Sequence, residues 1–259
     1  MKIAIFCAGD PRHIYFANKL CGHLPISRIF VEEKPSIYDG GRMKREADFF
    51  FGSPEGPSFD RNELVLRIND INCTDVESYL SSEINMLICT FGCSIIKMES
   101  AFRKGIDILN LHSGILPEYR GVHCVFWALY NREPDMVGGS IHLINRRIDA
   151  GEIMAKVFPA VSREDNEETL FNKVIKLGVD EFTQAAGFIY TYGSPVSQPQ
   201  RLRGRIYFVQ ERTEARELEL DAMLRDGLLE EVHCQKRIER FYEKAGEVTQ
   251  PKGGCGMAA

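Results

Sequence analysis

The sequence predicts an α/β fold, a Rossmann-like parallel sheet core flanked by helices, on three observations. Short apolar runs alternate with helix-length segments through the first 120 residues. Beyond them, two longer apolar runs meet across a turn, which predicts an antiparallel strand addition. After residue 200 the chain becomes charged and helix-like, which predicts a small C-terminal helical appendage. Strands separated by helices of about ten residues favour right-handed crossovers and therefore a parallel core.

Each parallel strand is predicted from a short apolar run bounded by polar residues. These strands are expected at 3–8, 26–31, 64–68, 84–91 and 106–111. A helix is predicted over 12–21, and the series Thr74 to Glu77 resembles a capping box that opens another. Residues 32–60 are rich in Gly, Pro and charge, so we expect a long excursion there.

The second half of the chain predicts longer elements. Apolar spacing indicates a helix at 122–131 and one long amphipathic helix over 166–190. Strands at 138–144 and 152–159 are expected to pair across the turn that contains Asp149. A stretch rich in Gly, Ser, Pro and Gln, 191–200, predicts a linker.

These elements predict three parts of the chain. The expected parts are a main domain over 1–190, a small appendage over 201–245 and a disordered tail over 246–259. Within the appendage we expect a strand at 205–210 and one or two charged helices between 213 and 244.

Composition narrows the class of protein. The 259 residues carry a formal net charge of −5, which argues against a general binder of nucleic-acid backbones. No apolar run approaches the roughly 20 residues of a membrane helix, and the N-terminus does not resemble a signal peptide. The eight cysteines form no CxxC pair, so we expect reduced thiols, no metal and a cytoplasmic protein.

Polar residues gather where one predicted parallel strand ends. Asn110 and His112 are two apart, so their side chains leave the strand on the same face. Open α/β sheets bind ligands at this end of the strands. Asp149 lies in a turn that can return a carboxylate to the same edge, where it would orient an imidazole. An amide, an imidazole and a carboxylate without a Ser or Cys nucleophile suit acyl transfer to a nucleophilic substrate.

Each of these residues taken alone also fits a structural role. An Asn-x-His pair at a strand end is common in structural settings, and Asp149 could simply form the turn. His142 alternates with apolar residues, so we expect it to be structural. Residue patterns by themselves therefore predict a polar site at a sheet edge and no specific reaction.

Two motifs resemble the folate-dependent formyltransferase family, which includes glycinamide ribonucleotide, methionyl-tRNA and sugar N-formyltransferases. The first is Asn-Leu-His-Ser-Gly-Ile-Leu-Pro-Glu-Tyr-Arg-Gly over 110–121. The second is Ile-Asp-Ala-Gly-Glu-Ile over 148–153, and His142 falls where the family has a strand histidine. The resemblance covers roughly residues 1–190 and is closest to the sugar-type or small-molecule members.

The resemblance implies roles for the catalytic set. Asn110 would hold the formyl oxygen, and His112 would assist as an imidazolium or a proton carrier. Asp149 would orient His112 and, through water, help to remove the proton of the attacking amine. The formyl donor would be N10-formyltetrahydrofolate, with no metal.

The resemblance also implies two binding regions. The expected folate-binding residues are Phe91, Gly92, Cys93, Ser94, Ile95, Ile96 and Arg147. The expected acceptor-binding residues are Arg12, His13, Tyr119, Arg120 and Gly121. A glycine-rich phosphate loop after the first strand is missing, because that place reads Cys-Ala-Gly-Asp-Pro-Arg-His. The short, mixed-charge region after 200 disfavours tRNA.

The expected activity is transfer of a formyl group to an amine or hydroxylamine of a small molecule, such as a nucleotide-linked amino sugar or a natural-product intermediate. The same residues would also serve a formyltetrahydrofolate hydrolase that releases formate, or a non-catalytic folate-binding protein. A formyl thioester of coenzyme A remains an alternative donor. Apolar surface on the C-terminal helices would make a homodimer plausible, whereas nucleic-acid and membrane partners are not expected.

Overall fold

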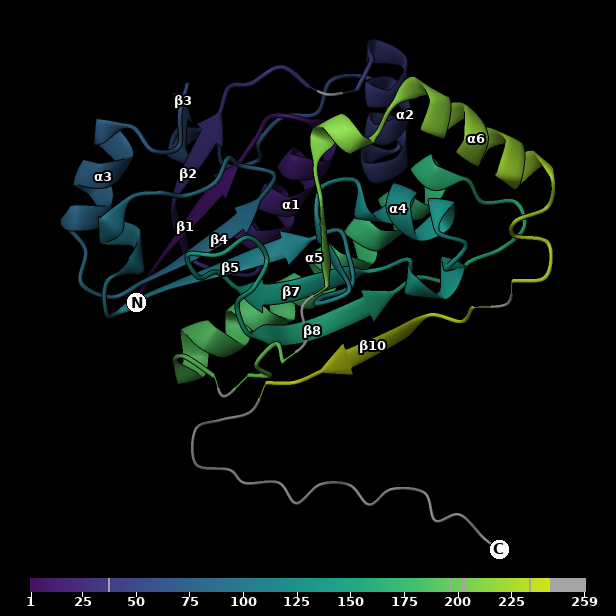
Figure 1. The fold of residues 1–259 in the computed structure, drawn as a ribbon. Helices are drawn as coiled ribbons and strands as arrows, with labels where there is room; N and C mark the ends of the chain where they lie inside the picture. Colours follow the sequence, from purple (N-terminus) through teal and green to yellow (C-terminus); the bar gives the residue numbers. More distant parts are fainter. Residues whose placement is uncertain (37, 196, 202–203, 233, 243–259) are drawn as a thin grey trace, which may run out of the picture.

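An eight-stranded sheet forms the centre of the protein in the computed structural model, which describes residues 1–36, 38–195, 197–201, 204–232 and 234–242. The strand order is β10-β8-β7-β5-β4-β1-β2-β3 (Figure 1). Their bounds are β1 Lys2–Cys7, β2 Ile26–Glu32, β3 Val65–Ile68, β4 Met86–Phe91, β5 Ile106–His112, β7 Gly139–Leu143, β8 Ile153–Phe158 and β10 Arg237–Arg240.

The strand directions confirm the predicted α/β class. β1 to β5 run parallel, as their separation by helices predicted. β7 pairs antiparallel with β5, β8 with β7, and β10 with β8. The antiparallel addition therefore lies against β5, the strand that carries Asn110 and His112.

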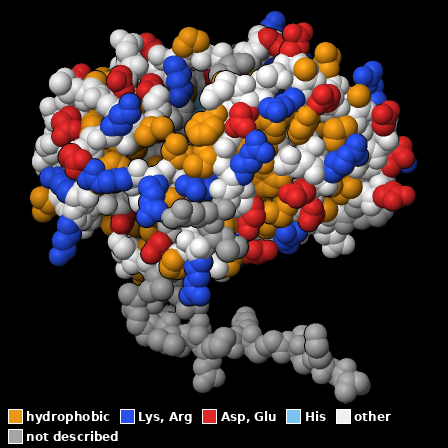
Figure 2. All heavy atoms as spheres, viewed as in Figure 1, with side chains coloured by type: hydrophobic (Ala, Val, Ile, Leu, Met, Phe, Trp, Pro, Cys, Tyr) orange, Lys and Arg blue, Asp and Glu red, His pale blue; other side chains and the backbone are white. Residues whose placement is uncertain are grey.

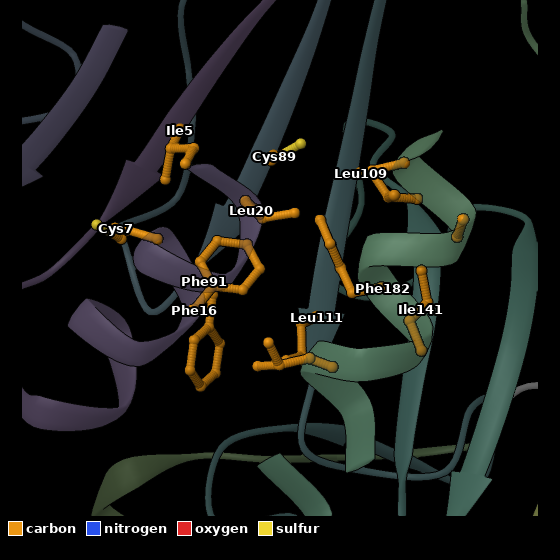
Figure 3. Packing of buried hydrophobic residues seen from close by; sticks show 14 of the residues in the cluster. Ile5, Cys7, Phe16, Leu20, Cys89, Phe91, Leu109, Leu111, Ile141 and Phe182 are labelled. Carbon is orange, nitrogen blue, oxygen red and sulfur yellow. The ribbon is translucent and has the colours of Figure 1, made fainter. Parts of the chain in front are cut away.

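Helices cover both faces of the sheet. On one face, α1 (Pro11–Cys21) and α5 (Glu167–Tyr192) pack on the apolar side chains of β1, β4 and β5. Figure 3 shows this packing, in which Phe16 and Phe182 meet edge to face at 4.9 Å. On the other face, α3 (Thr74–Ser81) and the 3-10 helix Glu99–Phe102 cover a second apolar cluster that contains Phe6 and Phe30. The sheet is buried on both faces, which is typical of parallel strands.

A second, smaller unit packs against the long helix α5. It contains α4 (Cys124–Tyr130), α6 (Glu214–Arg225) and a two-stranded parallel sheet of β6 (Tyr119–Gly121) and β9 (Arg205–Tyr207). α6 lies over α4 (Figure 1), and both contribute to an apolar cluster with Trp127 and Tyr207. The loop that follows β5 is thereby held between the main sheet and the C-terminal segment.

Two predictions from the first half of the chain are wrong in detail. The predicted excursion at 32–60 contains a helix, α2 (Gly40–Phe51), which begins after the side chain of Asp39 accepts a hydrogen bond from the Arg42 N–H. Its two initial glycines and its charged surface hide the helical period. α3 begins at Thr74 with Cys73 as its N-cap residue, so Thr74 is not the capping residue of a box.

The C-terminal part also differs from the prediction. Only α6 and the 3-10 helix Val209–Glu211 are helical in the described part of 201–242, and residues 237–240 form the edge strand β10. This strand has only four residues, so its pattern of charged and apolar residues does not distinguish a strand from a helix. The predicted linker, 191–200, begins within α5. Its residue Gln198 forms an antiparallel backbone pair with Ile153. The predicted tail lies outside the described residues, and the division into domains stays a prediction.

Surface character follows the mixed composition. On the face shown in Figure 2, Lys and Arg side chains are interspersed with Asp and Glu. Among the described residues, no helix combines the length and the apolar character that crossing a membrane requires.

Candidate functional site

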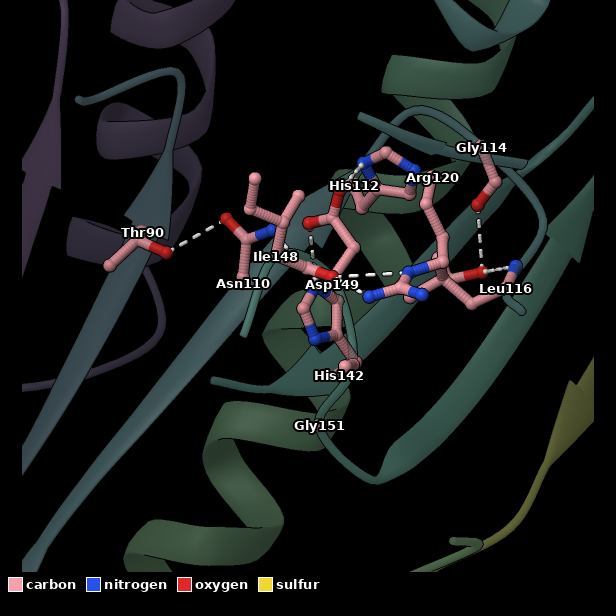
Figure 4. A network of polar contacts seen from close by, with 12 residues as sticks. Thr90, Asn110, His112, Gly114, Leu116, Arg120, His142, Ile148, Asp149 and Gly151 are labelled. Carbon is pink, nitrogen blue, oxygen red and sulfur yellow. Dashed lines mark hydrogen bonds and ion pairs between the residues drawn. The ribbon is translucent and has the colours of Figure 1, made fainter. Parts of the chain in front are cut away.

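The polar residues predicted at the end of β5 meet those of β7 and of the turn after it. β5 and β7 place Asn110 opposite His142, and His112 opposite Ser140. The turn 144–152 brings Asp149 back between the two imidazoles (Figure 4). The antiparallel addition therefore supplies half of the site.

Asn110 is held by hydrogen bonds at both ends of its amide. Its Oδ1 accepts from Thr90 Oγ1 at 2.8 Å, and its Nδ2 lies 3.0 Å from His142 Nε2. His142 Nδ1 lies 2.9 Å from the carbonyl oxygen of Leu143, so Nδ1 donates and Nε2 accepts. The second N–H of Asn110 is left to donate to another oxygen, and Asn110 lines a cleft.

The segment that follows β5 holds the imidazole of His112 in place. Its Nε2 donates to the carbonyl oxygen of Tyr119 at 2.8 Å. Its Nδ1 lies 3.8 Å from Asp149 Oδ2, an ion-pair distance rather than a hydrogen bond. Because Nε2 is engaged, Nδ1 is the nitrogen that can exchange a proton beside the carboxylate.

Asp149 adopts a left-handed backbone conformation, with φ of 46°. Its Oδ2 accepts a hydrogen bond from the Gly121 N–H at 2.7 Å, and its Oδ1 lies 3.7 Å from His142 Nε2. Arg120 donates to the carbonyl oxygen of Ile148, which holds the turn in place. Asp tolerates a left-handed conformation better than most residues, so the turn can direct its carboxylate back to the sheet.

Burial and charge set the protonation of this group. Burial lowers the pKa of His142 to about 4, although the nearby Asp149 carboxylate acts in the opposite direction. Burial alone would raise the pKa of Asp149, but His112, His142 and the Gly121 N–H together hold it below its usual value. The site therefore contains a neutral His142 and an ionised Asp149 at neutral pH.

A cleft of about 360 Å³ opens beside Asn110 and His112. That size is ordinary for a small-molecule site. Its walls come from the loops after β1, β2, β4 and β5, with aromatic side chains of Phe91, Tyr38 and Phe171. The carboxyl ends of four parallel strands thus face one cavity, as an open α/β sheet predicts.

Arg12 and His13, two of the residues that the resemblance implies for acceptor binding, both line this cleft. Arg12 is engaged by the carboxylates of Glu46, at 2.9 and 3.0 Å, and Asp10. His13 Nδ1 accepts from the Asp10 N–H at 3.3 Å, so its Nε2 carries the proton. Burial lowers the pKa of His13 well below its usual value, and the ring is a neutral donor. A Cβ at Gly92 would lie 2.1 Å from its Nε2, so only glycine leaves room for it there.

Only some residues of the expected folate loop line the cleft. Phe91, Gly92 and Cys93 line the cleft, whereas Ile96 is buried in the core and Ile95 is exposed. The Ser94 N–H donates to Glu32 at 2.7 Å, so that main-chain donor is engaged within the protein. Arg147 is exposed in the turn before Asp149.

Two expected acceptor-binding side chains have other partners. Tyr119 is buried, and its hydroxyl donates to Glu133. Arg120 is occupied by the Ile148 carbonyl oxygen. Gly121 does line the cleft, and its N–H holds Asp149.

Thr90 and His142 are the site residues that patterns alone missed. Thr90 lies within an apolar strand, where a threonine gives no distinct signal. His142 alternates with apolar residues, but its place opposite Asn110 depends on the pairing of β5 with β7. The antiparallel prediction together with the Asp149 turn could have suggested that pairing. In the described residues, no cluster of three or more His, Cys, Asp or Glu side chains could hold a metal ion.

The fold and the site define an α/β protein with a ligand cleft at the carboxyl ends of its parallel strands, bordered by an amide, two imidazoles and a carboxylate. Residues 69–186 match the family model described as formyl transferase. Methionyl-tRNA formyltransferase from Rhodopirellula baltica is 25% identical over 180 residues, which cover 68% of this chain and 52% of that protein. This chain spans only part of the curated relatives it matches, from 23% to 52% of their length.

Solved structures share the fold. A sugar N-formyltransferase from Shewanella sp. FDAARGOS_354 has a TM-score of 0.60 at 14% identity, covering 95% of this chain and all of that one. An N-formyltransferase from Helicobacter canadensis, in complex with folinic acid and dTDP-3-aminofucose, has a TM-score of 0.58 at 18% identity. That likeness covers 82% of this chain and 72% of the other. The family model and the curated relatives thus show that this chain is similar to formyltransferases, and the solved structures show a shared fold.

Proposed function

We propose that this protein transfers a formyl group from N10-formyltetrahydrofolate to the amine of a small molecule, in a site formed by Asn110, His112 and Asp149. The observation that carries the proposal is the arrangement of these residues beside the cleft. Asn110 keeps one N–H free, and Asp149 lies at ion-pair distance from His112. Similarity to formyltransferases favours the folate donor, and the similarly folded N-formyltransferase from Helicobacter canadensis was solved with folinic acid.

The chemistry requires little beyond orientation and charge stabilisation. The amine nitrogen attacks the formyl carbon, and the carbonyl oxygen becomes negatively charged. The free N–H of Asn110 donates to that oxygen, and His112 assists beside it. The C–N10 bond then breaks, the amine loses one proton and N10 gains one. His112 Nδ1 and Asp149 form the route for that proton, because they are the exchangeable pair next to the cleft.

The acceptor is a small molecule in this proposal, and sugar N-formyltransferases are among the solved structures that share this fold. The cleft is bounded by Tyr38, Phe171 and the first-strand loop, which suits a compact ligand with a flat or ring-shaped part. Positive and negative side chains are interspersed in Figure 2, which does not favour a nucleic-acid surface on that face. Arg12 is already engaged by Glu46 and Asp10, so it would orient neighbouring groups rather than bind a phosphate alone.

The test is tetrahydrofolate formation by the purified protein from N10-formyltetrahydrofolate, with and without a panel of amines. The panel includes amino-sugar nucleotides, glycinamide ribonucleotide, amino acids and hydroxylamines. Amine-dependent turnover is expected. Equal turnover with and without amine, accompanied by formate, would instead identify a hydrolase. Folate binding with no turnover for any amine would favour the non-catalytic alternative.

A further inference from the structure

The C-terminal segment after residue 203 is hydrogen-bonded to the loop that carries the candidate site. β9 runs parallel to β6, with Gly121 opposite Tyr207. The Val122 N–H donates to the Tyr207 carbonyl oxygen at 3.0 Å. The Arg205 N–H donates to the Glu118 carbonyl oxygen at 3.2 Å. The family match ends at residue 186, so this contact comes from a part of the chain outside it.

Two glycines allow the segments to approach each other this closely. A Cβ at Gly204 would lie 1.5 Å from the carbonyl oxygen of Pro117. A Cβ at Gly121 would lie 2.1 Å from the carbonyl oxygen of Tyr207, and Gly121 has a φ of 87°. Both obstacles are main-chain atoms, which cannot move aside as the end of a side chain can. The contact therefore depends on the absence of side chains at both positions.

Side-chain packing fixes the position of β9. The Tyr207 ring stacks on Trp127 at 4.8 Å and on Tyr119 at 5.7 Å. Asn131 donates from Nδ2 to the hydroxyls of Tyr207, at 2.8 Å, and Tyr119, at 3.1 Å. Tyr207 is 4% exposed, so this packing is part of the apolar cluster around α4.

The same loop holds two members of the candidate catalytic set. The Tyr119 carbonyl oxygen accepts from His112 Nε2 at 2.8 Å. The Gly121 N–H donates to Asp149 at 2.7 Å. Both groups belong to β6, whose outer neighbour is β9. A shift of β6 would therefore move the partners of His112 and Asp149 together.

Residues beyond β9 extend the same contact to the cleft. Arg212 Nη1 lies 3.3 Å from His123 Nδ1, and Arg212 also faces Glu167 of α5. His123 and Val209 both line the cleft. The segment thus supports the loop from its outer side and also forms part of the cavity wall.

We propose that β9, through Tyr207 and with the preceding Gly204, is a positioning element for the site. It holds β6 at the place where Tyr119 and Gly121 orient His112 and Asp149. The kinetic part of this inference rests on the proposed formyl transfer. The structural part, a link from β9 to His112, does not. A positioning element changes the rate of the chemical step more than the affinity for substrate, because the displaced groups act in the transition state.

The first variant is Gly204→Ala, whose added Cβ would collide with the Pro117 carbonyl oxygen. Gly56→Ala is the matched control, because no atom lies within 4 Å of the Cβ it would add. We expect kcat to fall on the order of 10- to 100-fold in Gly204→Ala, with KM for the amine changed by less than about threefold. Gly56→Ala should keep the wild-type kcat.

The second readout is independent of turnover. ¹⁵N-labelled histidine NMR reports the ring nitrogens of His112 directly, with assignment by His112→Gln. The His112 signals are expected to shift in Gly204→Ala and to stay in place in Gly56→Ala. Tyr207→Phe keeps the ring stacking and should resemble wild type, whereas Tyr207→Ala should shift the His112 signals as Gly204→Ala does.

Circular dichroism and thermal melting establish that each variant is folded, and Tyr207→Ala replaces Gly204→Ala where the latter does not fold. A folded variant with wild-type kcat and unshifted His112 signals would overturn the positioning role. Absence of formyl transfer in the wild-type protein would defeat the proposed function only. In that case the NMR shifts alone decide whether β9 positions His112.

Discussion

Asn110 and His142 lie opposite each other on β5 and β7, and Nδ2 of Asn110 is 3.0 Å from Nε2 of His142. The buried, neutral imidazole accepts this hydrogen bond, and Thr90 donates to the other end of the amide. Asn110 is thereby held in one orientation before any substrate binds. A donor fixed in advance stabilises developing negative charge without reorganisation during the reaction.

Asn110→Ala tests this directly. We expect kcat for formyl transfer to fall by about 10²- to 10³-fold, because one oxyanion donor is lost. Folate binding, measured by calorimetry, should change little. Asn62→Ala is the control. Asn62 is exposed on the short 3-10 helix Asn62–Leu64, which lies at the amino end of β3, whereas the cleft lies at the carboxyl ends of the strands. A near-wild-type rate in Asn110→Ala would contradict the assignment.

Asp149→Asn should reduce turnover by about 10²-fold or more. The substitution removes the carboxylate that, together with His112, takes part in removing the proton of the amine. Asn also tolerates a left-handed conformation, so the turn at φ 46° should keep its shape. Single-turnover kinetics separate this loss from a loss of binding. If the variant binds the substrates normally and turns over at the wild-type rate, Asp149 has no role in proton transfer.

Stability should fall in acid because His142 is buried without charge. Its pKa is about 4 in the folded protein, below the usual 6.5 of a histidine. As pH falls from about 6.5 to about 4, the unfolded chain binds a proton that the folded protein does not. The free energy of unfolding should therefore decrease by about 1.4 kcal/mol per pH unit for this residue. Below about pH 4 this contribution levels off.

Urea unfolding at pH 7, 6 and 5 measures that slope. His142→Gln should make the slope shallower, since the group that titrates is removed. His23→Gln, at an exposed position, is the control for the substitution itself. Burial also lowers the pKa of His123 to about 4 and that of His13 well below its usual value, so some slope should remain in His142→Gln. An unchanged slope in His142→Gln would exclude His142 as a source of the acid sensitivity.

Gly178 and Gly187 on α5 provide a paired test of how closely this helix packs on the sheet. Replacing a helical glycine by alanine usually stabilises a helix by about 1 kcal/mol. At Gly187 the new Cβ would meet only Leu24, at 3.9 Å, so Gly187→Ala should be stabilising. At Gly178 it would lie 2.7 Å from Leu111 Cδ1, where overpacking costs about 1–3 kcal/mol.

Gly178→Ala is therefore expected to lower the urea midpoint, and Gly187→Ala to raise it. A raised urea midpoint in both variants would show that helix propensity outweighs packing against β5. Leu111 lies between Asn110 and His112, so a destabilising Gly178→Ala should also reduce kcat.

The order of the elements was predictable because strand and helix periods are local properties of a sequence. The parallel strands, the antiparallel pair of β7 and β8 and the long helix α5 were all expected. α2 was missed because its charged surface and initial glycines weaken the helical pattern. β10 was mistaken for helix, because four residues cannot show a period and its pairing with β8 involves a segment about 80 residues away in the chain.

The sequence by itself determined the α/β class, the strand that ends in Asn110 and His112, and the turn that contains Asp149. Tertiary structure alone decided which groups these residues meet: Thr90 and His142 beside Asn110, and β6, supported by β9, beside His112 and Asp149. The physical reason is that side-chain direction follows from the local backbone, whereas hydrogen bonds across strands depend on pairing between distant segments. Burial, which makes His142 neutral, exists only once those segments have packed.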